Sequence, residues 1–420
     1  MTNRIYVDKL TLRNTYFLFR HNNYSDIRVL EGKGLYFSIY RFMFSVFKKK
    51  IYVEDFSFSI LRDPKGNSMY METIKKSTNY SFKLVDQVFR NNANLQLLDN
   101  ELDRPFLRLV SLKLAHQLLF PIFLRLAVFN SKKTNMADKF LFSSPGLGLE
   151  KHLSKSKEFK NTIILSSLKN TFRVWFNLIF KHWLNYQRYN FFGKLLKYNL
   201  GSPERNVKAS VLLIQDDDVH DDQSLRRLPT WNSLSSKSNK VSTLILKAHF
   251  SEKMFAIKHI NKLKSKDVFI IDFKTIFTQD ISSLTSVVKK KLSKITYIIG
   301  KAINNCRQQK HLSNFSLLIG LYANFNILFA TRLLPFLEKN NTKAIVLGDV
   351  YHKMSEICFL SGALSKIPVV SYQYSSLYKI SPNMLSIADF HLTFSKLYHQ
   401  IYQIGPIQPK KFYEAGLSYL

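Results

Sequence analysis

Cysteine is nearly absent from this sequence of 420 residues, which holds only Cys306 and Cys358, far apart in the chain. Two such residues exclude a disulfide framework and a cysteine-based metal site, and they agree with a reducing cytoplasm. The first ten residues carry Arg4, Asp8 and Lys9 where a secretory signal would need an apolar core. We therefore expect no signal peptide.

Acidic residues are scarce as well, with 29 Asp and Glu against 62 Lys and Arg, for a formal net charge of +33. Since 46% of the residues are hydrophobic, the chain is not a disordered polar one, and the charge lies on folded surfaces. This charge predicts attraction to nucleic acid, anionic lipid headgroups or phosphorylated substrates. An A/T-rich coding bias is the alternative source of the lysines.

Long apolar runs are missing too. The nearest approach, residues 106–129, is interrupted by Arg108, Lys113, His116 and Arg125. A spanning helix needs about 18 apolar residues, so none is expected. Neither a Walker loop nor a Gly-x-Gly-x-x-Gly run occurs.

Residues 1–205 show no regular alternation of strands and helices. Short extended segments are expected at 26–30 and 50–53, and apolar helices at 69–90 and 106–129. We predict that this part of the chain is a mainly helical, basic and aromatic region.

Residues 172–198 interleave aromatic rings with lysine and arginine, for example Trp175, Trp183 and Arg188. This composition suits the membrane-water interface, where rings lie at headgroup depth and cations meet anionic lipid. A helical hairpin packed within the N-terminal region is the alternative.

A different pattern follows the break at residues 201–204, and it predicts a second domain, 206–420. Short apolar runs, typical of strands buried on both faces, alternate with helical patterns at 282–306, 314–337 and 350–367. The runs are 209–214, 243–246, 268–271, 344–347, 369–371 and 390–393. Strands and helices in this order predict an α/β fold with a doubly wound, Rossmann-like parallel sheet.

Ligands of such sheets bind beyond the carboxyl ends of the strands. This rule selects the polar residues that follow four of the runs. They are Asp216, Asp217, Asp218, Gly348, Asp349, Gln373, Tyr374, Ser375, Ser376 and Ser395. We interpret Asp349 and Asp216 as candidate catalytic bases and the other eight as substrate-binding residues.

Each of these residues has a simpler alternative. Asp349 can cap the helix that follows it, and the acidic run 216–222, which includes His220, is more often a solvated loop than a cation site. No metal site is therefore expected. Three residues away from this edge are also interpreted. Asp389 is expected to end a turn before a strand, and a role in the binding cleft is its alternative. His391 is expected to be a packed strand residue and Glu356 a surface charge.

The segment 344–420 carries a likeness to a known family. Its order is a strand ending in Gly348-Asp349, an amphipathic helix, Ile367-Pro368 with a strand ending in Gln373, the strand Phe390–Thr393, a helix ending in Gly405, and Lys411–Gly416. This order resembles the end of the N-terminal domain of GT-B glycosyltransferases of surface-carbohydrate biosynthesis. That group is also similar to CDP-glycerol glycerophosphotransferases and UDP-GlcNAc 2-epimerases. The likeness extends more weakly back to about Val207.

The resemblance implies a glycosyltransferase, or its acceptor-side part, in polysaccharide or lipopolysaccharide synthesis. It implies a nucleotide sugar as donor, a lipid-linked or saccharide acceptor, no further cofactor, and a cytoplasmic enzyme held peripherally at the inner face of the cell membrane. Where such enzymes often have Gln-His-Gly, this chain has Gln373-Tyr374-Ser375. In the resembled enzymes a second, nucleotide-binding domain would follow Leu420. The resemblance therefore leaves three alternatives: the sequence is a fragment, a separate partner supplies that domain, or the chain has lost transferase activity.

Two functions of other classes compete with this interpretation. The charge and the aromatic-basic stretch also fit a nucleic-acid-binding protein. A membrane-associated scaffold without catalytic activity is the third reading.

Overall fold

The computed structural model describes the chain from Arg4 to Ala415, with gaps. The stretches left out are 22, 32–34, 48, 55–61, 63–65, 67, 133–138, 145, 161, 167, 200–210, 216–242, 248–267, 273–275, 278–279, 307–311, 348–352, 374–380 and 404–406. The chain forms two compact units, and each combines stretches distant in sequence. The first contains residues 1–92, 114–180 and 303–319, and the second contains 93–113, 181–302 and 320–420.

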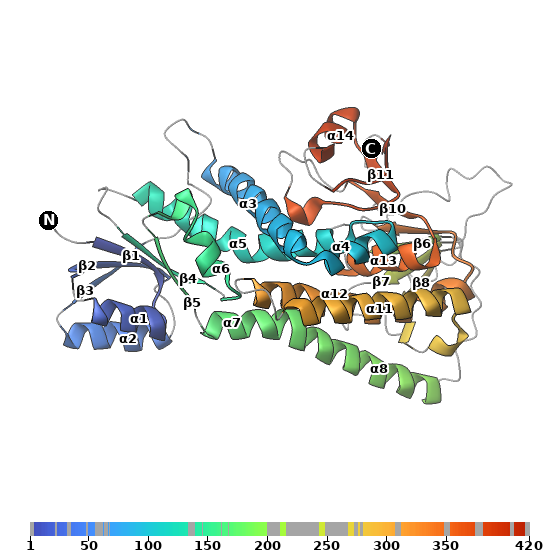
Figure 1. Cartoon of the computed structure of the whole chain (residues 1–420), viewed down its shortest axis with the longest axis horizontal. Helices are drawn as coiled ribbons and strands as arrows, with labels where there is room; N and C mark the ends of the chain where they lie inside the picture. Colours follow the sequence, from blue (N-terminus) through green and yellow to red (C-terminus); the bar gives the residue numbers. More distant parts are fainter. Residues whose placement is uncertain are drawn as a thin grey trace. The chain divides into compact units, whose positions relative to one another are not determined.

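The first unit contains a five-stranded parallel sheet (Figure 1). Its strands are β1 (Arg4–Lys9), β2 (Asp26–Glu31), β3 (Lys50–Val53), β4 (Lys139–Ser144) and β5 (Thr162–Ser166). They lie in the order β3-β2-β1-β4-β5, which is the order of a Rossmann-like half. The two strands expected near residues 26–30 and 50–53 are confirmed, whereas β1, β4 and β5 were not predicted.

Side chains alternate between the two faces of this sheet. Helices α1 (Leu12–Arg20) and α2 (Leu35–Val46) follow β1 and β2, and Ile5 and Val7 share one core cluster with Leu18 of α1 and Phe44 of α2. On the other face Tyr6 contacts Phe129, with ring centroids 5.7 Å apart. Both faces are therefore covered, which makes this a complete α/β layer within the N-terminal region.

Helices still make up most of the described part of residues 1–205. They are α3 (Met69–Asn91), α4 (Ala93–Leu102), α5 (Phe106–Lys132), α6 (Leu149–Leu153), a 3-10 turn η1 (Lys157–Phe159), α7 (Leu168–Trp175), a π-helical segment η2 (Phe176–Phe180) and α8 (Lys181–Asn199). Because α7, η2 and α8 follow one another without an intervening turn, the expected helical hairpin at 172–198 is wrong. The expectation that these residues lack strand-helix alternation is also wrong for β1 to β3.

The second unit contains a seven-stranded sheet in which every pair is parallel. Its strands are β6 (Val211–Gln215), β7 (Thr243–Lys247), β8 (Val268–Asp272), β9 (Ala344–Leu347), β10 (Val369–Tyr372), β11 (Phe390–Thr393) and β12 (Lys411–Glu414). The order is β12-β11-β10-β9-β6-β7-β8. The six predicted strands are confirmed, and so is the Rossmann-like α/β class.

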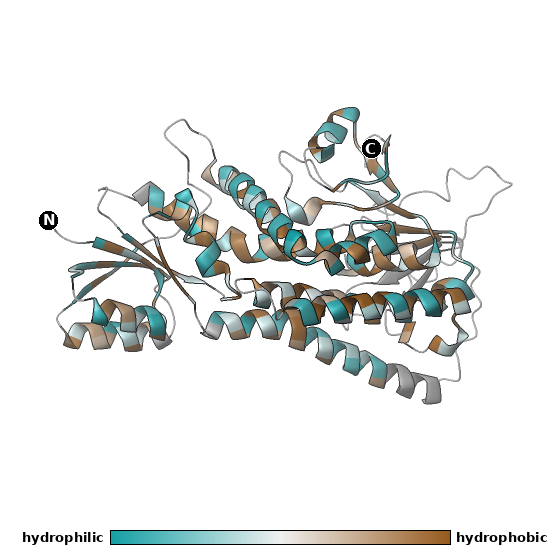
Figure 2. Cartoon of the chain, viewed as in Figure 1, coloured by the Kyte–Doolittle hydropathy of each residue, from teal (hydrophilic) through white to brown (hydrophobic). Residues whose placement is uncertain are grey.

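The helices between these strands match the expected ones. They are α11 (Ser286–Cys306), α12 (Ser313–Lys339), α13 (Lys353–Ser365) and α14 (Lys396–Gln403), with short 3-10 turns η4 (Ile281–Ser283) and η5 (Pro382–Met384). Helix α11 alternates between teal and brown in Figure 2, because Val288, Ile295 and Ile299 form its buried stripe while Lys289, Lys290 and Lys294 are exposed. Helix α13 ends before Pro368, as its sequence predicts.

Among the described residues, two helices are long and apolar enough to cross a membrane, judged by length and composition alone. They are Phe106–Asn130 within α5 and α12, with 67% and 61% of their most apolar windows buried inside the protein. The buried core helix of a globular protein meets the same criterion, so these two helices are weak evidence of a membrane span.

The start of α5 is fixed by a partly buried carboxylate, that of Asp99. Asp99 accepts the backbone N–H of Leu107 at 2.6 Å and that of Arg108 at 3.2 Å, so it satisfies two donors that the first helical turn leaves unpaired. These bonds favour the ionised form, but burial opposes it more strongly and raises the pKa of Asp99 to about 7.

We expect Asp99 to make stability depend on pH. Because its pKa is higher in the folded chain than in the unfolded one, the folded state binds a proton between about pH 4 and 7 that the unfolded state does not. The free energy of unfolding should therefore rise by about 2 to 3 kcal/mol from pH 8 to pH 5 through this group. Asp99→Asn should remove this increment in urea denaturation at both pH values. Asp103→Asn, at a carboxylate that is 92% exposed, should keep it, and equal pH slopes for D99N and the unaltered chain would refute the assignment.

Candidate functional site

The strand order of the seven-stranded sheet reverses between β6 and β9. The chain runs from β6 outwards to β7 and β8, then returns to place β9 on the other side of β6. Ile214 pairs with Leu347, so these two strands end side by side. In an open parallel sheet the ligand binds at the carboxyl edge beside this reversal.

The predicted acidic residues follow these two strand ends in sequence. Asp216, Asp217 and Asp218 come directly after Gln215, the last residue of β6, and Gly348 and Asp349 come directly after β9. All five lie outside the described residues, as do Tyr374, Ser375 and Ser376. The structure thus places the strand ends from which these residues continue, and the residues themselves stay a prediction.

Gln373 and Ser395 are the two predicted site residues that the structure describes, and both lie at the same edge. Gln373 follows β10 and is buried; its backbone N–H donates to the Leu392 carbonyl at 2.8 Å. Its side-chain oxygen accepts the N–H of Phe394 at 3.2 Å. Gln373 therefore links the end of β10 to the end of β11.

Ser395 lies one residue before α14 and is half-buried. Its carbonyl accepts the Thr393 hydroxyl at 3.2 Å, and Glu414 at the end of β12 accepts the N–H of Lys396 at 2.7 Å. The carboxylate thus binds the first turn of α14, where it also meets the positive end of the helix. Glu414 was not selected from the sequence, although it ends a strand in the segment that carries the family likeness.

A buried serine-histidine pair lies within the same sheet. The Ser371 hydroxyl is 2.8 Å from Nδ1 of His391 and 2.8 Å from the Ser386 hydroxyl. Burial lowers the pKa of His391 to about 3, so the ring is neutral. Since Ser371 and His391 are fully buried inside the strands, no substrate reaches them, and the prediction that His391 is a packed strand residue is confirmed.

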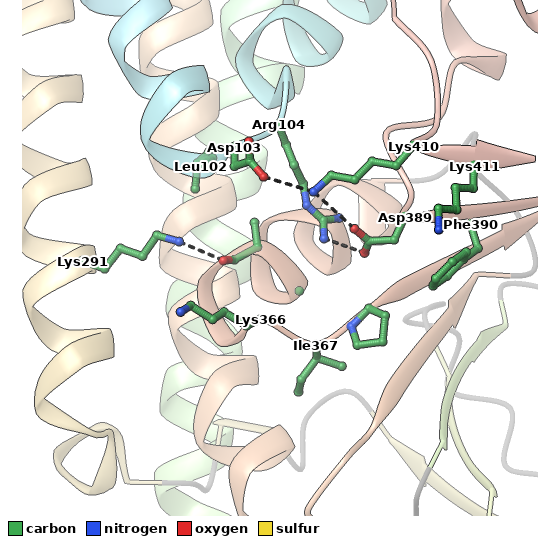
Figure 3. A pocket seen from close by; sticks show the side chains of 13 residues that line it. Leu102, Asp103, Arg104, Lys291, Lys366, Ile367, Asp389, Phe390, Lys410 and Lys411 are labelled. Carbon is green, nitrogen blue, oxygen red and sulfur yellow. Dashed lines mark hydrogen bonds and ion pairs between the residues drawn. The ribbon is translucent and has the colours of Figure 1, made fainter.

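A cavity of about 460 Å³ lies at the opposite, amino edge of this sheet (Figure 3). Pro368, Asp389 and Lys410 line it, and each directly precedes a strand. The other charged lining residues are Asp103, Arg104, Lys291, Lys366 and Lys411. Five cations therefore surround two carboxylates at the edge where the sheet rule places no ligand.

Asp389 is the centre of this cluster. Its carboxylate lies 2.6 Å from the Arg104 guanidinium and accepts the N–H of Val369 at 2.8 Å. Lys410 bridges Asp103 at 3.1 Å and Asp389 at 3.7 Å (Figure 3). Asp389 thus precedes a strand, as expected, and also lines a cavity, but it is engaged by the protein's own groups. We interpret the cluster as one that joins the residues directly after α4, Asp103 and Arg104, to the sheet.

Lys291, which lines the cavity, also binds the carboxyl end of a helix. Lys291 donates to the Ala363 carbonyl in the last turn of α13 at 2.9 Å. Burial lowers the pKa of Lys291, and Lys366 and Arg104 lower it further. A cation at a helix carboxyl end is stabilising, which explains a lysine there without an external anion.

The expectation that Glu356 is a surface charge is wrong, because this residue is only 3% exposed. Its carboxylate lies 3.7 Å from the Lys113 ammonium and accepts a hydrogen bond from the Asn326 amide at 3.2 Å. It also holds the pKa of the buried Tyr322 phenol above its usual value, after the larger effect of burial. Glu356 lies next to the apolar stripe of α13 in the helical repeat. Its partners, Lys113 of α5 and Asn326 of α12, are distant in sequence, so local sequence pattern does not reveal these contacts.

The order of the five-stranded sheet reverses between β1 and β4, and a carboxylate lies there too. Asp8 is fully buried and accepts the N–H of Ser143 at 3.0 Å, the Ser143 hydroxyl at 3.2 Å and the N–H of Lys9 at 2.8 Å. The Arg125 guanidinium lies 3.6 Å away. Burial raises the pKa of Asp8, whereas Arg125 and Ser143 act in the opposite direction. With so many donors, Asp8 fastens β1 to β4 and is not free to act as a base.

The structure offers no cluster of three or more His, Cys, Asp or Glu side chains that could hold a metal ion among the residues it describes, and the acidic run 216–222 lies outside them. The carboxyl edge of the seven-stranded sheet is therefore the candidate site, with Gln373, Ser395 and Glu414 as its described polar residues. No family model matches this chain, and no curated protein or solved structure matches it.

Proposed function

We propose that this chain is a glycosyltransferase, or the acceptor-side part of one, which uses a nucleotide sugar in the synthesis of surface polysaccharide or lipopolysaccharide. The observation that carries the proposal is the parallel seven-stranded sheet, whose order reverses where the acidic segments 216–218 and 348–349 begin. A ligand site is expected at that point on physical grounds.

The presence of two sheets supports the same proposal. GT-B enzymes, which the segment 344–420 resembles, contain two Rossmann-like domains. This chain has a second parallel sheet of Rossmann-like order in residues 4–166, before the segment with the likeness. A separate polypeptide that completes the donor site remains part of the proposal.

In the proposed reaction, an acceptor hydroxyl attacks the anomeric carbon of the donor sugar. The bond from that carbon to the nucleoside diphosphate breaks, and the diphosphate leaves with the electron pair. Asp349 or Asp216 takes the proton of the hydroxyl, because among the ten residues predicted at the edge the aspartates are ionised at neutral pH and can accept a proton. Ser395, with Tyr374, Ser375 and Ser376, is proposed to bind sugar hydroxyls. Tyr374 stands where the resembled enzymes have histidine and cannot act as a base at neutral pH.

The proposal places the enzyme in the cytoplasm, peripheral to the inner face of the cell membrane. A nucleotide sugar and a lipid-linked acceptor would meet there.

Donor turnover tests this proposal. The full chain, alone and with a candidate donor-domain partner, is incubated with a panel of nucleotide sugars and saccharide or lipid-linked acceptors, and release of nucleoside diphosphate is measured. Asp349→Asn and Asp216→Asn should each lower the rate at least a hundredfold if that residue is the base. Glu338→Gln, on α12 away from the sheet edge, should keep it. Absence of turnover with every donor, in a folded chain with its partner, would sink the proposal.

A further inference from the structure

Helix α2 exposes a continuous apolar stripe. Phe42 is 70% exposed and Val46 is 61% exposed, and Ile39, Met43 and Phe47 are exposed beside them. Positions 39, 42, 43 and 46 lie on one face of a helix, because 3.6 residues complete a turn. In Figure 2 the helix is largely brown and pale.

This stripe is not part of the core. Phe37 and Phe44, on the other side of α2, are buried in the cluster that covers the five-stranded sheet. The helix is thus apolar on both sides, and among the described residues of the first unit only the side with Phe37 and Phe44 packs into the core. Contiguous exposed apolar surface of this kind marks a binding surface in a protein that works in water.

Aromatic rings continue the stripe towards α1. The ring of Phe47 meets the ring of Phe19 edge-on, with centroids 4.9 Å apart. Leu12 and Tyr16, one helical turn apart on α1, are exposed as well. We call the exposed residues of α1 and α2, from Leu12 to Phe47, the α1–α2 face.

The described charged side chains of α2 and of the residues directly after it are positive. They are Arg41, Lys49 and Lys50, and the nearest acidic residues in the sequence are Glu31 and Glu54, on either side of this stretch. Helix α1 adds Arg13 and Arg20, again without an acid. The Lys49 ammonium lies 6.0 Å from the centre of the Phe19 ring, at the margin of the apolar stripe.

We propose that the α1–α2 face binds the surface of an anionic lipid membrane. An apolar stripe enters the boundary between headgroups and acyl chains, and the surrounding cations meet the lipid phosphates. Self-association through this face fits less well, because it would place the lysines and arginines of two copies next to each other without acidic partners from α1 or α2. Nucleic acid would suit the cations but would leave an aliphatic stripe of Ile39, Met43 and Val46 without an apolar partner.

This placement differs from the one expected from sequence. In residues 172–198 several large apolar side chains are exposed, whereas Leu178 and Tyr189 are buried; the exposed ones are Phe172, Phe176, Phe180, Trp183, Leu184 and Phe191. These six are spread over residues 172–191, whereas the five exposed apolar residues of the α2 stripe lie within residues 39–47, so the α2 stripe is the denser apolar surface. The membrane contact needs no sugar donor, so its test is independent of the proposed transferase activity.

Vesicle flotation of the full chain tests the proposal. Binding to vesicles with 30 mol% phosphatidylglycerol should exceed binding to pure phosphatidylcholine vesicles at least tenfold, and it should weaken as salt rises. The double variant Phe42→Gln with Val46→Gln should lose at least tenfold in vesicle affinity. Val287→Gln, at a single valine of α11 that is 72% exposed, should bind as the unaltered chain does.

Three further measurements make the outcome decisive. Phe42→Trp should be quenched by brominated lipid, which reports direct contact. Loss of binding in Phe172→Gln with Phe176→Gln but not in the α2 variant would overturn the placement. A monomer-dimer shift abolished by the α2 variant, with no vesicle binding, would assign the face to a second copy and overturn the proposal. A circular dichroism spectrum that matches the unaltered chain establishes that each variant is folded.

Discussion

Arg104→Met is expected to lower the free energy of unfolding by about 3 to 5 kcal/mol. The guanidinium is 7% exposed and lies 2.6 Å from Asp389, so its removal leaves a largely buried carboxylate that has lost its closest counter-charge. The N–H of Val369 still donates to Asp389, and Lys410 at 3.7 Å replaces only part of the attraction. Urea denaturation followed by circular dichroism measures the loss.

Lys410 provides the matched comparison. Its side chain is 50% exposed, so Lys410→Met should cost less than about 1 kcal/mol. Asp389→Asn keeps an acceptor for Val369, and the double variant R104M with D389N should cost at least about 2 kcal/mol less than the sum of the two single variants. Additive losses, or a K410M loss equal to that of R104M, would show that the Arg104–Asp389 pair does not join the residues directly after α4 to the sheet.

The second sheet could be predicted because its strands have a clear sequence pattern. Runs such as Ala344–Leu347 and Val369–Tyr372 are short, apolar and bounded by polar residues, and the helices between them carry clear stripes. Such runs fit a sheet covered on both faces. Their parallel pairing followed from the right-handed crossover rule rather than from any single residue.

The first sheet was not predicted as a sheet, because the sequence of its central strand, β1, lacks the apolar pattern of a buried strand. β1 begins with Arg4 and ends with Asp8 and Lys9, which suggest exposure in a sequence. Asp8 is nevertheless fully buried, because β4 and α5 supply donors that neutralise its cost. The strand that follows β3 is β4, and the three helices α3 to α5 separate them in the chain, so no regular spacing signals the pair.

The residues of the candidate site also divide into those that local sequence pattern predicts and those that it does not. The carboxyl-edge rule selected Gln373 and Ser395 from sequence, and both lie at that edge. Glu414 and the Arg104–Asp389 cluster depend on contacts between segments far apart, such as the residues directly after α4 and those directly before β11, which local pattern does not reveal. Glu356 was misjudged for the same reason: its partners on α5 and α12 come from 243 and 30 positions away.

Asp8→Asn is expected to destabilise the first unit by about 3 to 5 kcal/mol. The variant is almost the same size as the natural side chain, but it replaces one acceptor oxygen with an amide donor. The N–H of Ser143 and the N–H of Lys9 donate to different oxygens of Asp8, so the amide would face one of these two donors in either orientation, and Arg125 would lose its counter-charge. Each buried donor left without a partner costs about 1 to 3 kcal/mol. Urea denaturation of the full chain at pH 7 measures the change.

Asp26→Asn is the control, because it makes the same replacement in the same sheet at a carboxylate that is 16% exposed. Asp26 pairs with Arg4 at 2.7 Å and with Arg28 at 3.3 Å near the surface, so its loss should cost about 1 kcal/mol. The comparison also decides the charge of Asp8 in the folded chain. An asparagine imitates a protonated aspartic acid, so a D8N loss no larger than that of D26N would mean that Asp8 is already neutral. A much larger loss means that the donors around Asp8 hold it ionised despite burial, and that this buried charge fastens β1 to β4.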